Sequence, residues 1–273
     1  MREYSTKISL THNSRGVYSL DPIFGCASGM AEQKAGCYGD CYAAKSAKLY
    51  GYDFKKNVLR SFQNPLHLRE VTNAISRIPL DFVRMGTMGE PSEDWAHTVG
   101  ICKLIADCNK EIVIITRHWN VLTNAQLDYF SRANVCINTS VSALDKSEIM
   151  ARCLAQYERI KPFCKSVLRV ITCDFNQDNE EGKRLSAIQD ALLDNDNVLE
   201  TVLRLNKRNP LVKGGIVNIR AVSFLGKKQF ASKRNSRTYL GKCGTCTEMC
   251  GVKIGSTTPY AGRPGILKQL ELR

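Results

Sequence analysis

The residues of this 273-residue chain that could do chemistry are concentrated in two cysteine triplets. Both lie in glycine-rich, loop-like sequence, one around GCYGDCYAAK and the other around KCGTCTEMCG. Thiolates ligate zinc and iron–sulfur clusters, so each triplet is a candidate metal site. The first triplet consists of Cys26, Cys37 and Cys41, and the second consists of Cys243, Cys246 and Cys250.

The other six cysteines occur singly in apolar stretches, where a free cysteine behaves as a small hydrophobe. This interpretation requires a reducing compartment. The segment MREYSTKISL has no apolar signal region, and apolar runs such as IVII are too short to span a bilayer, so we expect a cytoplasmic protein with no membrane partner. We expect these six cysteines in the core: Cys102, Cys108, Cys136, Cys153, Cys164 and Cys173.

Zinc, an iron–sulfur cluster and a thiol redox pair are the alternatives for the triplets. CGTC at 243–246 has the spacing of a zinc knuckle, whereas the ten residues between Cys26 and Cys37 suit zinc poorly. A redox pair is the weakest alternative, because CGTC does not stand near the start of a βα unit. A [4Fe–4S] cluster held by three cysteines leaves one iron open to a small molecule, which makes the first triplet a candidate reaction centre.

Short β-branched runs alternate with helix-like segments along most of the chain. This alternation is typical of successive βα units and predicts an α/β fold, a partial or full (β/α) barrel of parallel strands, with the first triplet in the first βα loop. Predicted strands span 81–89, 111–119, 135–144, 166–175, 198–205 and 214–224, after an extended segment at 16–24. Predicted helices span 92–109, with Ser92 as N-cap, then 123–134, 147–163 and 181–195, and two more lie between 42 and 79.

Polar residues stand where the predicted strands end. In parallel α/β folds ligands bind at the carboxyl ends of the strands, so we expect these residues to share one site. His118 is the histidine best placed to take part in it. The strand-end residues are Gly89-Glu90-Pro91, Thr116-Arg117-His118, Ser140-Val141-Ser142, Thr172-Cys173-Asp174 and Arg220.

A three-cysteine loop ending in CYA, followed by a strand ending in MGEP at 88–91, resembles the radical S-adenosylmethionine (SAM) superfamily. The spacing C-x10-C-x3-C is wider than the usual one. It is more similar to a small branch from phage and bacterial genomes that also carries a cysteine cluster near its C-terminus. The resemblance covers residues 25–51, the MGEP element, the βα alternation and the terminal cluster.

This resemblance implies a set of cofactors and ligands. Cys26, Cys37 and Cys41 would hold a [4Fe–4S] cluster whose open iron binds SAM, beside Tyr42. An electron donor such as flavodoxin or ferredoxin would reduce the cluster. The second triplet would bind either a second iron–sulfur cluster or zinc. The SAM contacts that the resemblance implies are Gly89 and Glu90 for the amine, and Ser140, Ser142 and Arg169 for the ribose and carboxylate.

The formal net charge of +13 comes from the last quarter of the chain, because residues 201–273 contain 15 Lys and Arg against 2 acidic residues. Basic segments are typical of contact with phosphate backbones. Residues 204–242 also interleave aromatic and basic side chains, which suits nucleic acid as a partner. We expect a barrel domain at 1–225 and a small basic, cysteine-rich extension at 226–273.

Two functional hypotheses follow. The first is a radical SAM-like iron–sulfur enzyme that cleaves SAM and acts on a nucleic acid or a nucleotide. The alternative is a non-catalytic, zinc-stabilised nucleic-acid-binding protein. The Gly-Glu-Pro strand end favours the enzyme, because a binding module has no use for a SAM site.

Overall fold

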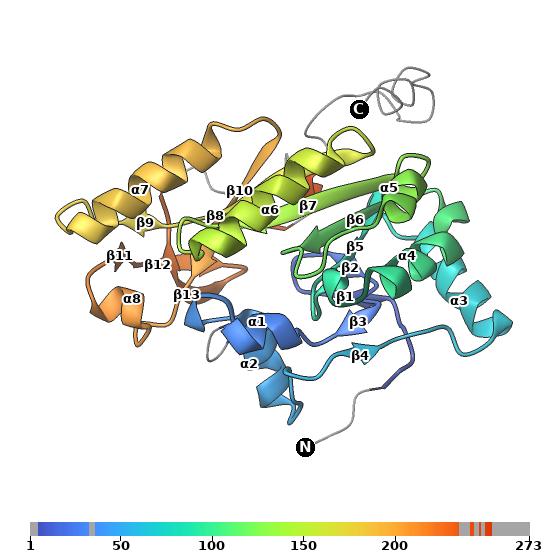
Figure 1. Ribbon diagram of the computed structural model, residues 1–273. Coiled ribbons are helices and arrows are strands. Elements are labelled where there is room, and N and C mark those ends of the chain that lie inside the picture. The colour runs from blue at the N-terminus through green and yellow to red at the C-terminus, as the bar shows by residue number, and fades with distance from the viewer. Residues whose placement is uncertain (1–4, 33–35, 235–240, 243–245, 247–248, 253–273) are drawn as a thin grey trace, which may run out of the picture.

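The computed structural model describes residues 5–32, 36–234, 241–242, 246 and 249–252 (Figure 1). Within them the largest sheet has nine strands in the order β1-β2-β5-β6-β7-β8-β10-β13-β12. Its strands are β1 (Thr11–His12), β2 (Tyr18–Ser19), β5 (Phe82–Met85), β6 (Glu111–Thr116), β7 (Val135–Val141), β8 (Lys165–Thr172), β10 (Val198–Arg204), β12 (Arg220–Phe224) and β13 (Lys227–Ser232). Two smaller sheets pair β3 (Ile23–Phe24) with β4 (Val58–Leu59), and β9 (Asp174–Phe175) with β11 (Val217–Asn218).

Within the main sheet, the strands β2, β5, β6, β7, β8 and β10 run parallel to one another, as predicted. Helices α4 to α7 alternate with these strands along the chain, and α1 and α2 lie near β3 and β4 (Figure 1). The α-helices are α1 (Ala27–Glu32), α2 (Tyr42–Leu49), α3 (Pro65–Ser76), α4 (Trp95–Leu104), α5 (Asn124–Phe130), α6 (Ser147–Ile160), α7 (Glu180–Leu193) and α8 (Pro210–Lys213). Short 3-10 helices span Cys37–Gly39, Pro91–Asp94, Ala106–Cys108 and Met249–Gly251.

The predicted helix at 92–109 is broken, which corrects the sequence analysis. A 3-10 helix, Pro91–Asp94, precedes α4, and the N-cap of α4 is Asp94, whose carboxylate accepts from the N–H of His97 at 2.9 Å. Ser92 is not the cap, because its hydroxyl is already used. It donates to Glu90 at 2.7 Å and accepts from the N–H of Trp119 at 2.8 Å.

The predicted strand at 214–224 is also wrong, because it consists of the two separate strands β11 and β12. β12 then turns back into the antiparallel strand β13. The turn is Leu225-Gly226, with φ of 51° and 75°, and a two-residue hairpin with two positive φ angles suits the twist of its strands. β13 pairs with β10, so the main sheet continues past residue 225.

The sheet is open within the described residues, with β1 and β12 as its two end strands. Its two faces bury different sets of side chains because successive residues of a strand point to opposite sides. On the helix-covered face Val83, Ile114 and Ile137 pack against residues of α4 and α5. On the other face Phe82 and Val167 belong to a smaller core that Cys250 and Val252 cover.

The six singly placed cysteines are buried, which confirms that prediction, with exposed fractions from 0% to 4%. In the part of the chain that the structure describes, none of the helices combines the length and the apolar character that crossing a bilayer requires.

Candidate functional site

The first triplet meets the Gly-Glu-Pro element at the carboxyl end of β5. The N–H of Gly25 donates to the carbonyl of Met88, and the N–H of Glu90 donates to the carbonyl of Gly25, both at 3.1 Å. Gly25 and Gly89 thus form a parallel bridge. Cys26, the residue after Gly25, lies beside the end of β5, as the shared-site hypothesis requires.

This close approach depends on glycine. A Cβ placed on Gly89 would lie 1.8 Å from the carbonyl oxygen of Ile23, far inside contact distance. Gly25 has a φ of +97°, and its Cβ would lie 2.0 Å from the carbonyl oxygen of Lys56. Both neighbours are backbone atoms, so no side chain can move away to make room.

Glycines also border the three half-buried thiols. A Cβ on Gly29 would lie 2.7 Å from the sulfur of Cys26 and 3.8 Å from that of Cys37. A Cβ on Gly36 would lie 3.5 Å from the sulfur of Cys41. The sulfurs of Cys26 and Cys37 therefore lie close to the same point on α1.

Asp40 fixes the loop between Cys37 and Cys41 to the segment that follows β10. Its carboxylate accepts from the N–H of Asn206 at 2.8 Å and from the side-chain amide of Asn209 at 2.9 Å, and it pairs with Lys45. Although burial opposes ionisation, the bonds from Lys45, Asn206 and Asn209 together lower the pKa of Asp40. The carboxylate therefore anchors the loop in its charged form.

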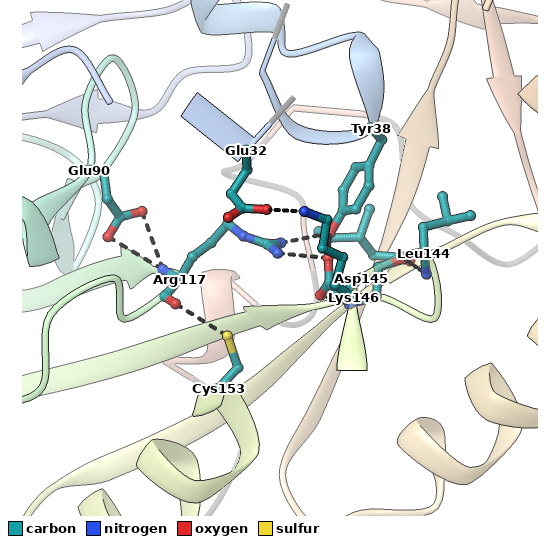
Figure 2. A network of polar contacts seen from close by, with 10 residues as sticks. Glu32, Tyr38, Glu90, Arg117, Leu144, Asp145, Lys146 and Cys153 are labelled. Atoms are coloured by element: carbon teal, nitrogen blue, oxygen red, sulfur yellow. Dashed lines mark hydrogen bonds and ion pairs between the residues drawn. The ribbon is translucent and has the colours of Figure 1, made fainter. Parts of the chain in front are cut away.

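A buried ion pair fixes the other side of the same loop (Figure 2). The guanidinium of Arg117, at the end of β6, donates to Asp145 at 2.6 Å and to the hydroxyl of Tyr38 at 2.6 Å. The Tyr38 hydroxyl donates in turn to Asp145 at 2.9 Å. The side chains of Arg117 and Asp145 are only 10% and 1% exposed. Tyr38, the neighbour of Cys37, is thereby attached to the ends of β6 and β7.

The Glu90 carboxylate binds within the protein instead of facing a ligand. It accepts from the N–H and hydroxyl of Ser92, from the hydroxyl of Thr116 at 2.5 Å and from the N–H of Arg117 at 3.2 Å. Burial raises the pKa of Glu90, and the bonds from Thr116, Ser92 and Arg117 oppose that shift. Its side chain links the end of β5 to the end of β6, so a contact with the SAM amine would have to come from the backbone of this element.

Asp21 holds the turn that carries the Gly-Glu-Pro element. Its carboxylate accepts from the backbone N–H groups of Gly86, Thr87 and Met88 at 2.8 to 2.9 Å. Burial raises the pKa of Asp21, while the bonds from Thr87 and Met88 oppose the shift. Three N–H donors on one carboxylate make this turn rigid.

Burial favours the protonated form of the Cys26 and Cys37 thiols in the metal-free protein. Burial, reinforced by the Glu90 carboxylate, raises the pKa of Cys26. Burial raises the pKa of Cys37 to about 11, although the nearby Arg117 opposes the shift. Metal ligation requires thiolates, so a metal would displace these protons on binding.

The donor set fits an iron–sulfur cluster better than a harder metal ion, because it consists of three soft sulfur ligands. Within the residues that the structure describes, no three His, Cys, Asp or Glu side chains are grouped so that they could hold a metal ion. A cluster at the first triplet would therefore require the three sulfurs to come closer together. Coupling of metal binding to such local ordering is common.

The predicted SAM contacts on later strands differ in their surroundings. Ser140 and Arg169 are register partners on β7 and β8 and belong to the face opposite the helices. Ser142 is fully buried, and its hydroxyl donates to the carbonyl of Ile171 at 2.8 Å, a bond within the protein. His118 is also fully buried, and burial lowers its pKa to about 3, so it is neutral at physiological pH and bonds to Thr139.

The second triplet lies only partly within the described residues, since Cys243 falls outside them. Cys246 is half-buried. Cys250 packs on the face of the sheet opposite the helices, where its carbonyl accepts from Asn138 at 2.9 Å. The segment around Cys250 thus lies on the same face of the sheet as Arg169 and Arg84.

Sequence reasoning missed the residues that hold the cysteine loop. Arg117 was expected only as one strand-end residue of a shared site, and Asp21, Tyr38, Asp40 and Asp145 were not singled out. Asp21, Asp40 and Asp145 stand in loops, where Asp is common, so their positions in the sequence give no sign of the residues they bind. The charged residue directly before Cys41, in GDC, was the one available signal.

No protein-family model, no curated protein and no solved structure is significantly similar to this chain.

Replacement of Gly89 by alanine is expected to destabilise this site strongly. Because the new Cβ overlaps a backbone carbonyl, we expect Gly89→Ala to lower the free energy of unfolding by about 3 kcal/mol, measured by urea denaturation. Gly100→Ala is the matched control: it lies in α4 with nothing within 4 Å of the added Cβ. It should raise stability by about 0.5–1 kcal/mol. Equal effects of the two substitutions would contradict the role of Gly89.

Proposed function

We propose that this chain is a radical SAM-type iron–sulfur enzyme built on a partial (β/α) barrel. The observation that carries the proposal is the backbone pairing of Gly25 with Gly89, which joins the three-cysteine loop to the Gly-Glu-Pro strand end. Cys26, Cys37 and Cys41 would hold a [4Fe–4S] cluster there. When bound, the cluster would pass one electron from a flavodoxin- or ferredoxin-like donor to SAM, cleaving it to methionine and a 5′-deoxyadenosyl radical.

The electrostatics beside Cys26 support SAM as the ligand. SAM carries a sulfonium and an ammonium group. Burial is the main cause that raises the pKa of Cys26, and the carboxylates of Glu90 and Glu93 add negative charge beside it. Glu93 also accepts from the N–H of Ser28 at 2.7 Å, which fixes the start of α1. These groups favour a cationic ligand at the cysteine loop.

The protein's own part in the reaction is to position and shield. The rigid turn held by Asp21 presents the backbone of Gly89 and Glu90 to the SAM amine. The Arg117–Asp145–Tyr38 network and the Asp40 bonds hold the two sides of the cysteine loop. Tyr42, next to Cys41, donates its hydroxyl to the carbonyl of Thr87, so its ring bridges the loop and the turn.

Anaerobic purification with iron, sulfide and zinc assays tests the proposal, together with EPR of the reduced protein with and without SAM. The expected result is about four irons or more per chain and an EPR signal that SAM changes. Zinc without iron, after anaerobic reconstitution, would refute the enzyme and leave the zinc-stabilised nucleic-acid-binding protein as the function.

A further inference from the structure

Two arginines lie on the face of the sheet opposite the helices, and Arg15 and Arg204, both stacked on the ring of Phe224, lie near them. Arg84 on β5 alternates with Val83 and Met85, which face the helix-side core, so Arg84 faces the other way. Arg169 on β8 alternates with Leu168 and Val170 in the same manner. Arg204, the last residue of β10, and Arg15, in the turn before β2, complete the group. All four are half-buried.

These arginines repel one another. Burial lowers the pKa of Arg169, the nearby Cys250 opposes this shift, and the charges of Arg84 and Arg15 add to it. Burial also lowers the pKa of Arg204, again with contributions from Arg15 and Arg84. For Arg169 and Arg204 these shifts mean that the guanidinium loses water and gains a like-charged neighbour.

The group has no balancing carboxylate among the described residues. None of the ion pairs formed there includes any of the four arginines. Arg84 donates to the sulfur of Cys250 at 4.0 Å, and the Asp21 carboxylate that acts on it already accepts three backbone N–H groups. Half-buried guanidiniums without carboxylate partners favour an anionic ligand.

The guanidiniums are held in place before any ligand arrives. Arg204 lies 5.7 Å from the ring centre of Tyr42 and 5.2 Å from that of Phe224, and Arg15 lies 5.6 Å from Phe224. Arg84 donates to the hydroxyl of Thr87 at 3.1 Å, and Arg15 donates to the carbonyl of Gly241 at 3.0 Å. Tyr42 is 47% exposed, so the group is open to solvent beside this ring.

We propose that Arg15, Arg84, Arg169 and Arg204 bind the phosphate groups of the substrate, a phosphorylated small molecule such as a nucleoside phosphate. SAM does not suit this group, because its sulfonium and ammonium outweigh its single carboxylate. Four guanidiniums match several negative charges, and their forked donors match phosphate oxygens. The role of these arginines as a substrate site rests on the proposed function. Their affinity for phosphate does not depend on it.

Tyr42 joins this phosphate site to the cysteine loop. Its ring lies under Arg204, its hydroxyl bonds to Thr87 before the Gly-Glu-Pro element, and it follows Cys41 directly. A phosphorylated molecule bound by the arginines would therefore extend past Tyr42 toward the proposed SAM site. This arrangement places an anionic substrate and a cationic cosubstrate on opposite sides of one ring.

Calorimetric titration of the full chain with inorganic pyrophosphate at 150 mM NaCl tests the proposal. The wild type is expected to bind pyrophosphate, and Arg169→Gln and Arg204→Gln are each expected to weaken binding about 10-fold, since each removes a charge-assisted hydrogen bond. Arg132→Gln, an exposed arginine paired with Asp128, is the matched control and should bind like the wild type. Equal affinity in all four proteins, or no binding, would overturn the proposal.

Two further measurements separate the remaining explanations. Pyrophosphate should raise the melting temperature of the wild type more than that of Arg169→Gln, which excludes misfolding of the variant as the cause of weak binding. A single-stranded oligothymidylate that binds far more tightly than pyrophosphate, and loses affinity in the same variants, would overturn a small-molecule substrate in favour of nucleic acid. Pyrophosphate binding by protein that takes up no iron would refute the proposed function alone and leave the phosphate site standing.

Discussion

Cys37→Ala is expected to abolish the SAM-dependent change in the EPR signal and to remove about four irons per chain. Three thiolates hold the proposed cluster, and the loss of one leaves two ligands and a second open iron, which would expose the cluster to dissociation. The measurement is the iron and sulfide content after anaerobic reconstitution, with EPR of the reduced protein with and without SAM. Cys26→Ala and Cys41→Ala should give the same result.

Cys102→Ala is the matched control for these variants. It removes a thiol of the same kind that is fully buried and contacts the sulfur of Met85 at 3.8 Å, away from the triplet. We expect this variant to keep its iron and its response to SAM while losing about 1 kcal/mol of stability. Retention of the SAM response in Cys37→Ala would show that the first triplet does not hold the cluster. Iron that persists in Cys37→Ala without a SAM response would belong to the second triplet.

Arg117→Ala is expected to lower the free energy of unfolding by about 3–5 kcal/mol, measured by urea denaturation. The substitution leaves the Asp145 carboxylate buried at 1% exposure without its cation, and a buried unpaired charge is far more costly than the pair. It also removes the donor that holds the Tyr38 hydroxyl.

Arg132→Ala is the control for this substitution, because Arg132 pairs with Asp128 on an exposed helix end and should cost about 1 kcal/mol or less. Combining Arg117→Ala with Asp145→Asn should recover part of the lost stability, since the second change removes the uncompensated charge. If Arg117→Ala cost no more than Arg132→Ala, the buried pair would have no part in holding the loop.

The fold class followed from local patterns in the chain. Runs such as EIVIIT and VCINTSV are rich in β-branched residues and largely buried on both faces, which is typical of strands in a parallel sheet. The predicted strands at 111–119 and 135–144 are therefore present, ending at Thr116 and Val141, and they are parallel as predicted. The hairpin at Leu225-Gly226 could not, because a leucine with positive φ is rare and gives no turn signal.

The residue types of the candidate site were also present in the sequence, but their partners were not. Spacing alone placed Cys26, Cys37 and Cys41 in one loop and Gly89-Glu90 at a strand end. Only the tertiary structure showed that the carboxylate of Glu90 binds the end of β6 and that Ser142 is buried. Hydrogen-bond partners far apart in the chain leave no periodic trace, so a pattern cannot tell a ligand-facing side chain from one that ties two strands together.

The sequence by itself determined an α/β chain with a strongly basic last quarter and two soft-metal donor sets, because composition and short-range periodicity set these properties. The tertiary structure alone decided where the charges meet. The arginine group comes from four separate segments of the chain. Only Arg204 belongs to the basic region at 204–242, whereas Arg15, Arg84 and Arg169 precede it. Arg84 and Arg169 share one face of the parallel sheet, and Arg15 and Arg204 join them over the ring of Phe224, which no count along the chain can reveal.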